Sequence, residues 1–137
     1  MDKNNNFTYQ LRVYYEDTDA GGIVYYANYL KFAERARTEW LRALGINQSF
    51  FLEQKLGFVV RKVEMDNKAS AKLDDLLTIT TTISNLKKAS LQFKQDIHNQ
   101  DGVLLCSISV LVASVNLEKA RPCPIPQVIL GALTSAR

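Results

Sequence analysis

One stretch near the N-terminus predicts the only long helix of this chain, and this helix restricts how the other segments can fold. Apolar residues recur there at three- and four-residue steps, with charged residues between them. Gly45 follows at a position where helices often end. Other parts of the chain must cover the apolar side of such a helix. The residues expected on that side are Leu30, Ala33, Ala36 or Arg37, Trp40, Leu41 and Leu44.

Most of the remaining sequence has the pattern of β-strands. Apolar and polar residues alternate strictly from Phe7 to Glu16, which predicts a strand with one buried face. Four further strands are expected, at residues 58–65, 76–86, 90–98 and 103–117. A short second helix is expected from Gln48 to Leu56, closed by Gly57, and a helical turn or two at residues 127–134.

These elements predict an α+β fold, in which one five-stranded antiparallel sheet wraps around one long helix. A chain of 137 residues fits a single domain, with residues 1–6 and 127–137 expected to be peripheral and the first six to be frayed. The edges of such a sheet favour self-association.

Composition excludes several classes of function. The formal charge is +3 and the chain has no run of five basic residues, so we expect no nucleic-acid partner. No apolar run approaches the roughly 18 residues that a membrane span needs. The N-terminus lacks the apolar segment of a signal peptide, which favours a cytoplasmic location. His98 is the only histidine and no CxxC pair occurs, so we expect no metal site.

The turn before the long helix contains Asp17 and Asp19, followed by Gly21 and Gly22. Asp residues at such positions often cap the turn or the helix. Alternatively, a carboxylate beside the N-terminal amides of a helix can act as base or nucleophile, while those amides stabilise a developing negative charge. A magnesium site is the weakest interpretation, because neither further carboxylates nor a phosphate-binding glycine loop accompany the pair.

The run from Tyr14 to Tyr29, YYEDTDAGGIVYYANY, and the ERARTEWL helix after it closely resemble the hot-dog-fold acyl-CoA thioesterases. The resemblance is to the 4-hydroxybenzoyl-CoA thioesterase family and its Tol–Pal-associated branch. It extends through FVVRK, LDDLLTI and the proline-rich segment PCPIP, so it covers nearly the whole chain. It implies a hot-dog fold and hydrolysis of an acyl-CoA thioester to a free carboxylic acid and CoA, with no cofactor.

The resemblance also implies roles for individual residues. Asp19 would be the catalytic carboxylate, and the backbone N–H of Tyr26 would polarise the thioester carbonyl. Many members of the Tol–Pal-associated branch carry histidine where this chain has Tyr26, so only the backbone role carries over. The active site of the family lies at a dimer interface, where Val59, Val60 and Arg61 of a second subunit would approach the acyl group or pantetheine. A homodimer or homotetramer is therefore expected.

Several alternatives stay open at this point. Asp19 can attack the thioester directly or activate a water molecule. A hot-dog dehydratase or hydratase would depend on a histidine, and His98 lies far along the chain from the aspartates. A non-enzymatic alternative is an envelope-associated protein or a binding partner of acyl carrier protein.

Overall fold

The computed structural model describes residues 6–137. Of the segment expected to be frayed, residues 1–5 lie outside the described residues, and Asn6 is the first residue of β1. The elements in chain order are β1 (Asn6–Arg12), a 3-10 turn (Tyr15–Asp17), α1 (Asn28–Ala43), α2 (Gln48–Glu53), β2 (Leu56–Asn67), β3 (Leu76–Ser84), β4 (Ser90–His98), β5 (Leu104–Asn116), β6 (Arg121–Pro122) and α3 (Gln127–Ala136).

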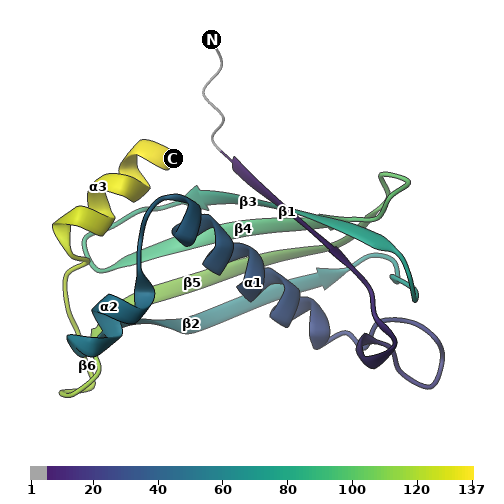
Figure 1. Ribbon diagram of the computed structural model, residues 1–137, viewed down its shortest axis with the longest axis horizontal. Coiled ribbons are helices and arrows are strands. Elements are labelled where there is room, and N and C mark those ends of the chain that lie inside the picture. The colour runs from purple at the N-terminus through teal and green to yellow at the C-terminus, as the bar shows by residue number, and fades with distance from the viewer. Residues whose placement is uncertain (1–5) are drawn as a thin grey trace, which may run out of the picture.

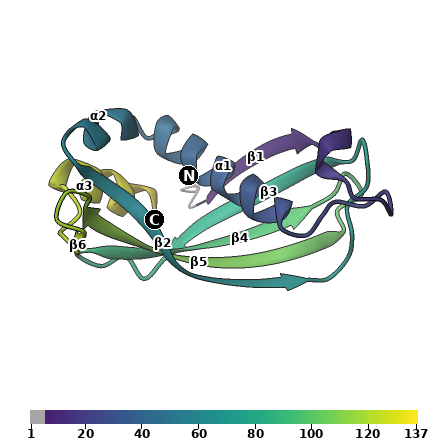
Figure 2. The same ribbon diagram turned by 90° about the horizontal axis from the view of Figure 1, so that it is seen from below.

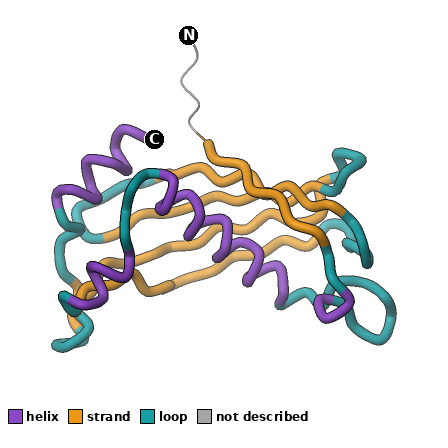
Figure 3. Tube along the Cα trace, in the orientation of Figure 1, coloured by secondary structure: helices purple, strands orange, loops and turns teal. Residues whose placement is uncertain are grey.

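The strands form one curled antiparallel sheet in the order β1-β3-β4-β5-β2, and α1 lies across one face of it (Figures 1 and 2). This arrangement confirms the predicted α+β fold. The short strand β6 adds to β5, so the sheet has six strands rather than the five expected. Figure 3 shows that α2 and α3 lie at one end of the sheet, whereas the loop before α1 lies at the other end.

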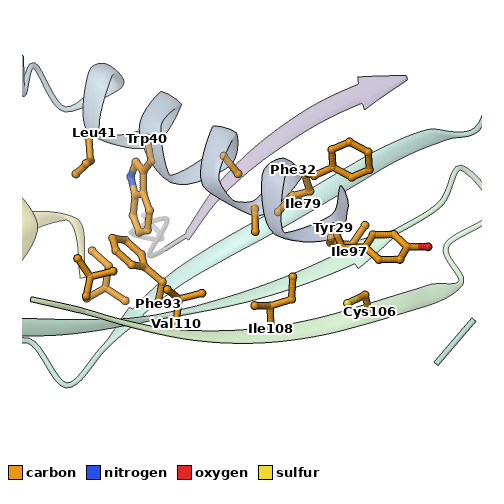
Figure 4. Close-up of a cluster of buried hydrophobic side chains, with 14 of the residues drawn as sticks. Tyr29, Phe32, Trp40, Leu41, Ile79, Phe93, Ile97, Cys106, Ile108 and Val110 are labelled. Atoms are coloured by element: carbon orange, nitrogen blue, oxygen red, sulfur yellow. The ribbon is translucent and has the colours of Figure 1, made fainter. Parts of the chain in front are cut away.

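The core lies between α1 and the sheet. Ala33 and Ala36 are fully buried on α1, and their small side chains let the helix approach the strands closely. Further along α1, Trp40 meets the edge of Phe93 with ring centroids 6.3 Å apart (Figure 4). Close packing of this kind makes the interior sensitive to changes in side-chain volume. The other labelled core residues in Figure 4 are Tyr29, Phe32, Leu41, Ile79, Ile97, Cys106, Ile108 and Val110.

The buried side of α1 differs at its start from the side expected. Tyr29 and Phe32 are buried, whereas Leu30 is 37% exposed. Three residues before Ala36 is Ala33, and four residues before Ala33 is Tyr29, so these three residues share one face of the helix. Leu30 lies next to that buried face. Gly45 follows the helix with a φ of 82°, which confirms its predicted role at the C-terminal end.

Several predicted boundaries differ from the structure by one or two residues, and the ends of β1 and α2 differ by more. β1 ends at Arg12 rather than Glu16, because the chain enters the 3-10 turn at Tyr15. The second helix ends at Glu53, before Lys55 takes a left-handed φ of 65°. Gly57 consequently belongs to β2, where it pairs with Val115.

The C-terminal segment contributes to the core, although we expected it to be peripheral. Residues 127–136 form α3, and its residues Ile129 and Leu133 are buried. Ile125, just before the helix, is also buried. These buried residues join the hydrophobic core and hold the end of the chain against it.

Candidate active site

Asp17 holds together the loop that leads into α1. Its side-chain Oδ2 accepts a hydrogen bond from the backbone N–H of Tyr14 at 2.8 Å. Its carbonyl oxygen accepts bonds from the Tyr25 backbone N–H and from the Asn28 side-chain amide, both at 3.0 Å. Asp17 thus connects the end of the 3-10 turn to the first residue of α1, in agreement with the structural interpretation of this aspartate.

Asp19 lies in a tight turn that leaves part of its carboxylate free. Its Oδ1 accepts a hydrogen bond from the Gly21 N–H at 2.8 Å, and its carbonyl accepts one from the Gly22 N–H at 3.0 Å. Within residues 6–137, Oδ2 of Asp19 accepts no hydrogen bond. Gly22 has a φ of 80°, which favours glycine over every other residue type. The turn therefore presents one free carboxylate oxygen to the surroundings.

Tyr26 lies just before α1, where helices leave backbone N–H groups without partners. The Asn28 N–H bonds the Tyr25 carbonyl at 2.8 Å, and the Tyr29 N–H bonds the Tyr26 carbonyl at 3.2 Å. Within residues 6–137, the Tyr26 N–H itself donates no hydrogen bond. The Tyr26 side chain is 57% exposed. This amide is thus available to a ligand oxygen.

A surface hollow of about 330 Å³ brings Asp19 and Tyr26 together. The segment between β2 and β3 forms its opposite wall, and the buried Tyr29 fixes that wall by accepting a hydrogen bond from the Ala71 N–H at 3.0 Å. Burial raises the pKa of Tyr29, so its hydroxyl stays protonated near neutral pH. The residues that line the hollow are Asp19, Ile23, Val24, Tyr25, Tyr26, Tyr29, Asn67, Ala69 and Ser70.

Asn67, Ala69 and Ser70 were missing from the candidate site residues. They follow Asp19 by about fifty positions and reach it only because β2 ends beside the loop before α1. No local motif marks them in the sequence, so only the three-dimensional structure could have found them.

Val59, Val60 and Arg61 do not line the hollow of Asp19 in the same chain. They lie on β2, which is an edge strand of the sheet, and the side chains of Val59 and Val60 are 38% and 50% exposed. Arg61 is the extra residue of a β-bulge, because Val60 pairs with Val112 and Lys62 with Leu111. Bulges redirect side chains and often occur beside functional sites.

The histidine His98 and the buried cysteine Cys106 do not line this hollow. His98 ends β4. Burial raises the pKa of the Cys106 thiol to about 11, so this cysteine is a poor nucleophile at neutral pH. In the part of the chain that the structure describes, no group of three or more His, Cys, Asp or Glu residues is placed to hold a metal ion. No helix among these residues has the length and apolar character of a membrane span.

The curled sheet, the long helix across it and the aspartate turn at the start of that helix define a protein of the hot-dog class. A solved 1,4-dihydroxy-2-naphthoyl-CoA thioesterase from Synechocystis has the same fold, with a TM-score of 0.89 at 23% identity, covering 94% of this chain and 96% of that one. This likeness confirms the hot-dog fold.

Sequence comparison gives the family. Residues 13–133 match the Thioesterase-like superfamily. The chain is 46% identical to the acyl-CoA thioesterase YbgC of Haemophilus influenzae, covering 94% of this chain and 95% of the relative. A solved probable thioesterase from Bartonella henselae is 39% identical with a TM-score of 0.82, covering 88% of this chain and 99% of that one. The chain therefore belongs to the thioesterase-like superfamily, as its resemblance to hot-dog thioesterases predicted.

Proposed function

We propose that this protein hydrolyses an acyl-CoA thioester to a carboxylic acid and CoA, with Asp19 as the catalytic carboxylate and the Tyr26 N–H as the oxyanion donor. One observation carries this proposal. A carboxylate with a free oxygen and a backbone N–H without an acceptor line the same hollow at the start of α1. The name of the Haemophilus influenzae relative, an acyl-CoA thioesterase, supports the choice of substrate.

Hydrolysis of a thioester by this site would need only a carboxylate and an oxyanion donor. The thioester oxygen would accept a hydrogen bond from the Tyr26 N–H, which stabilises the negative charge that develops there. In one route, Asp19 takes a proton from water as the hydroxide adds to the carbonyl carbon, and the C–S bond then breaks. In the other route, the Asp19 carboxylate adds to that carbon, the thiolate leaves, and water hydrolyses the resulting anhydride. A thiolate is a good leaving group, so neither route needs a histidine or a metal.

We further propose that two copies associate along β2. This strand is twelve residues long and pairs on one side with β5, while Val59, Val60 and Val63 expose apolar surface along it. Two antiparallel β2 strands would set residues 56–61 of one copy beside residues 62–67 of the other. In this register, Val59, Val60 and Arg61 of the partner copy would lie beside residues 62–64, on the strand whose last residue, Asn67, borders the hollow of Asp19. They would therefore lie a few residues along β2 from that hollow. A cytoplasmic location stays a prediction.

A panel of short, long and aromatic acyl-CoA substrates tests the proposed function. Continuous detection of free thiol should reveal turnover with at least one member of the panel. The same acyl groups attached to acyl carrier protein would be assayed in parallel. Absence of thiol release from every CoA thioester, together with stable binding of acyl carrier protein, would instead support the non-enzymatic alternative.

A further inference from the structure

A second cavity, of about 150 Å³, opens beside the middle and end of α1 and shares no residue with the hollow of Asp19 in the same chain. Polar and apolar residues both line it, and they come from α1, α2, the sheet and α3. One basic side chain, Arg37, lines it. The apolar residues around it include Leu41, Phe58, Val60, Leu91, Phe93 and Leu133.

Arg37 is a half-buried cation with unused hydrogen-bonding capacity. A guanidinium group has five N–H donors. Within residues 6–137, the only acceptor for them is Oε1 of Gln95, 3.0 Å from Nη1, and the guanidinium carbon lies 6.0 Å from the centre of the Phe93 ring. Gln95 is in turn held by bonds from its Nε2 to the Ala33 carbonyl and the Thr81 hydroxyl. Gln95 thus fixes the orientation of Arg37, while the other N–H donors of the guanidinium have no acceptor among the described residues.

No carboxylate neutralises Arg37 directly. Among the described residues, no acidic oxygen lies within 4.0 Å of its guanidinium nitrogens. Glu34 also lines the cavity and precedes Arg37 by three residues, a spacing at which ion pairs can form on a helix. However, the Glu34 carboxylate accepts a hydrogen bond from the Thr38 hydroxyl at 2.6 Å instead. Glu34 acts on the Arg37 charge electrostatically but does not contact it, so N–H donors of the guanidinium remain free for an anion in the cavity.

An apolar cavity of about 220 Å³ continues from this site towards α2 and α3. The two cavities share Gln48 and Phe58 in their walls, so they adjoin each other. The lining of this 220 Å³ cavity is largely apolar and includes Phe51, Leu52, Leu56 and Ile129. A ligand that extends from Arg37 past Phe58 would therefore meet a positive charge at one end and apolar walls at the other.

We propose that this pair of cavities binds a free fatty acid, with its carboxylate on the Arg37 guanidinium and its alkyl chain directed past Phe58 beneath α2. Arginine suits this role because its planar fork matches the two oxygens of a carboxylate. A fatty acid is also one product class of acyl-CoA hydrolysis. The binding itself, however, does not require that Asp19 be catalytic.

Calorimetric titration with decanoate tests this inference. We expect saturable binding of one decanoate per chain, with acetate and decyl alcohol each binding at least about tenfold more weakly. Acetate lacks the apolar chain and decyl alcohol lacks the charge. If decyl alcohol bound as tightly as decanoate, the proposal would be overturned. This comparison uses the wild-type protein, so it does not depend on the folding of a variant.

Variants locate the binding site. Arg37→Gln should weaken decanoate binding by about tenfold or more, because a charge-assisted hydrogen bond is lost. Arg35→Gln removes the same charge from the exposed side of α1 and should bind decanoate like the wild type. Asp19→Asn should also keep its affinity, which separates this site from the hollow of Asp19. Wild-type affinity in Arg37→Gln, or loss of binding in Asp19→Asn, would contradict the assignment.

Discussion

The turn of Asp19 depends on the positive φ of Gly22. Its φ of 80° is unfavourable for residues with a Cβ, although no heavy atom lies within 4 Å of the position a Cβ would take. Backbone strain, rather than a clash, should therefore determine the effect of Gly22→Ala. We expect a loss of about 1–2 kcal/mol in the free energy of unfolding, measured with urea.

The matched control is Gly131→Ala in α3. A Cβ at Gly131 also meets no atom within 4 Å, but this glycine has no positive φ. Alanine should be neutral there or stabilise the helix by about 0.5–1 kcal/mol. If Gly22→Ala left the free energy of unfolding unchanged, the turn would be less constrained than its geometry indicates.

For individual residues, the sequence predicted that Asp19 and Tyr26 lie together, but it did not predict Asn67, Ala69 or Ser70 beside them. The spacing of Asp17 and Asp19 left open which of them supports the turn. The hydrogen bonds of Asp17 to Tyr14, Tyr25 and Asn28 give it that role, whereas Asp19 keeps a free oxygen. Such differences depend on backbone direction within a few residues, which composition and spacing do not encode.

At the scale of elements, the close contact of α1 with the sheet depends on small residues. Ala36 is fully buried, so Ala36→Leu would force extra volume into a closely packed interface. We expect a destabilisation of about 1–3 kcal/mol in chemical unfolding. Ala43→Leu, at an exposed position near the end of α1, should change stability by less than about 0.5 kcal/mol. Equal effects of the two changes would contradict the packing described for α1.

Most elements could be predicted because their patterns are strong. The strand at residues 90–98 agrees with β4 at both ends, and α1 appears where the three- and four-residue spacing placed it. The errors have local causes. Lys55 takes a left-handed conformation that its residue type does not suggest, and the 3-10 turn interrupts an alternating pattern that continues through Tyr15.

At the scale of the whole molecule, β2 is an edge strand that carries exposed apolar side chains. A long edge strand with apolar side chains is a ready site for pairing with another chain. Val63→Arg should therefore lower the molar mass measured by light scattering from that of a dimer to that of a monomer. Thiol release should fall with it, if the partner copy completes the site.

Val128→Arg is the control for this substitution. Val128 is 71% exposed on α3 and is not part of β2, so the same change of side chain should leave mass and activity unaltered. A monomeric wild-type protein with full activity would refute the proposed association. The sequence predicted self-association only in general terms, because any open sheet has edge strands. Which strands form the edges is known only from the observed strand order.

The rate of free-thiol release by Asp19→Asn measures whether Asp19 performs the chemistry. Asp17→Asn is the matched control, because an asparagine side chain at this position can still accept the Tyr14 N–H through its amide oxygen. We expect Asp19→Asn to fold normally and to lose about two to four orders of magnitude in kcat. Asp17→Asn should stay within about tenfold of the wild type. A folded Asp19→Asn variant with the wild-type rate would contradict the account.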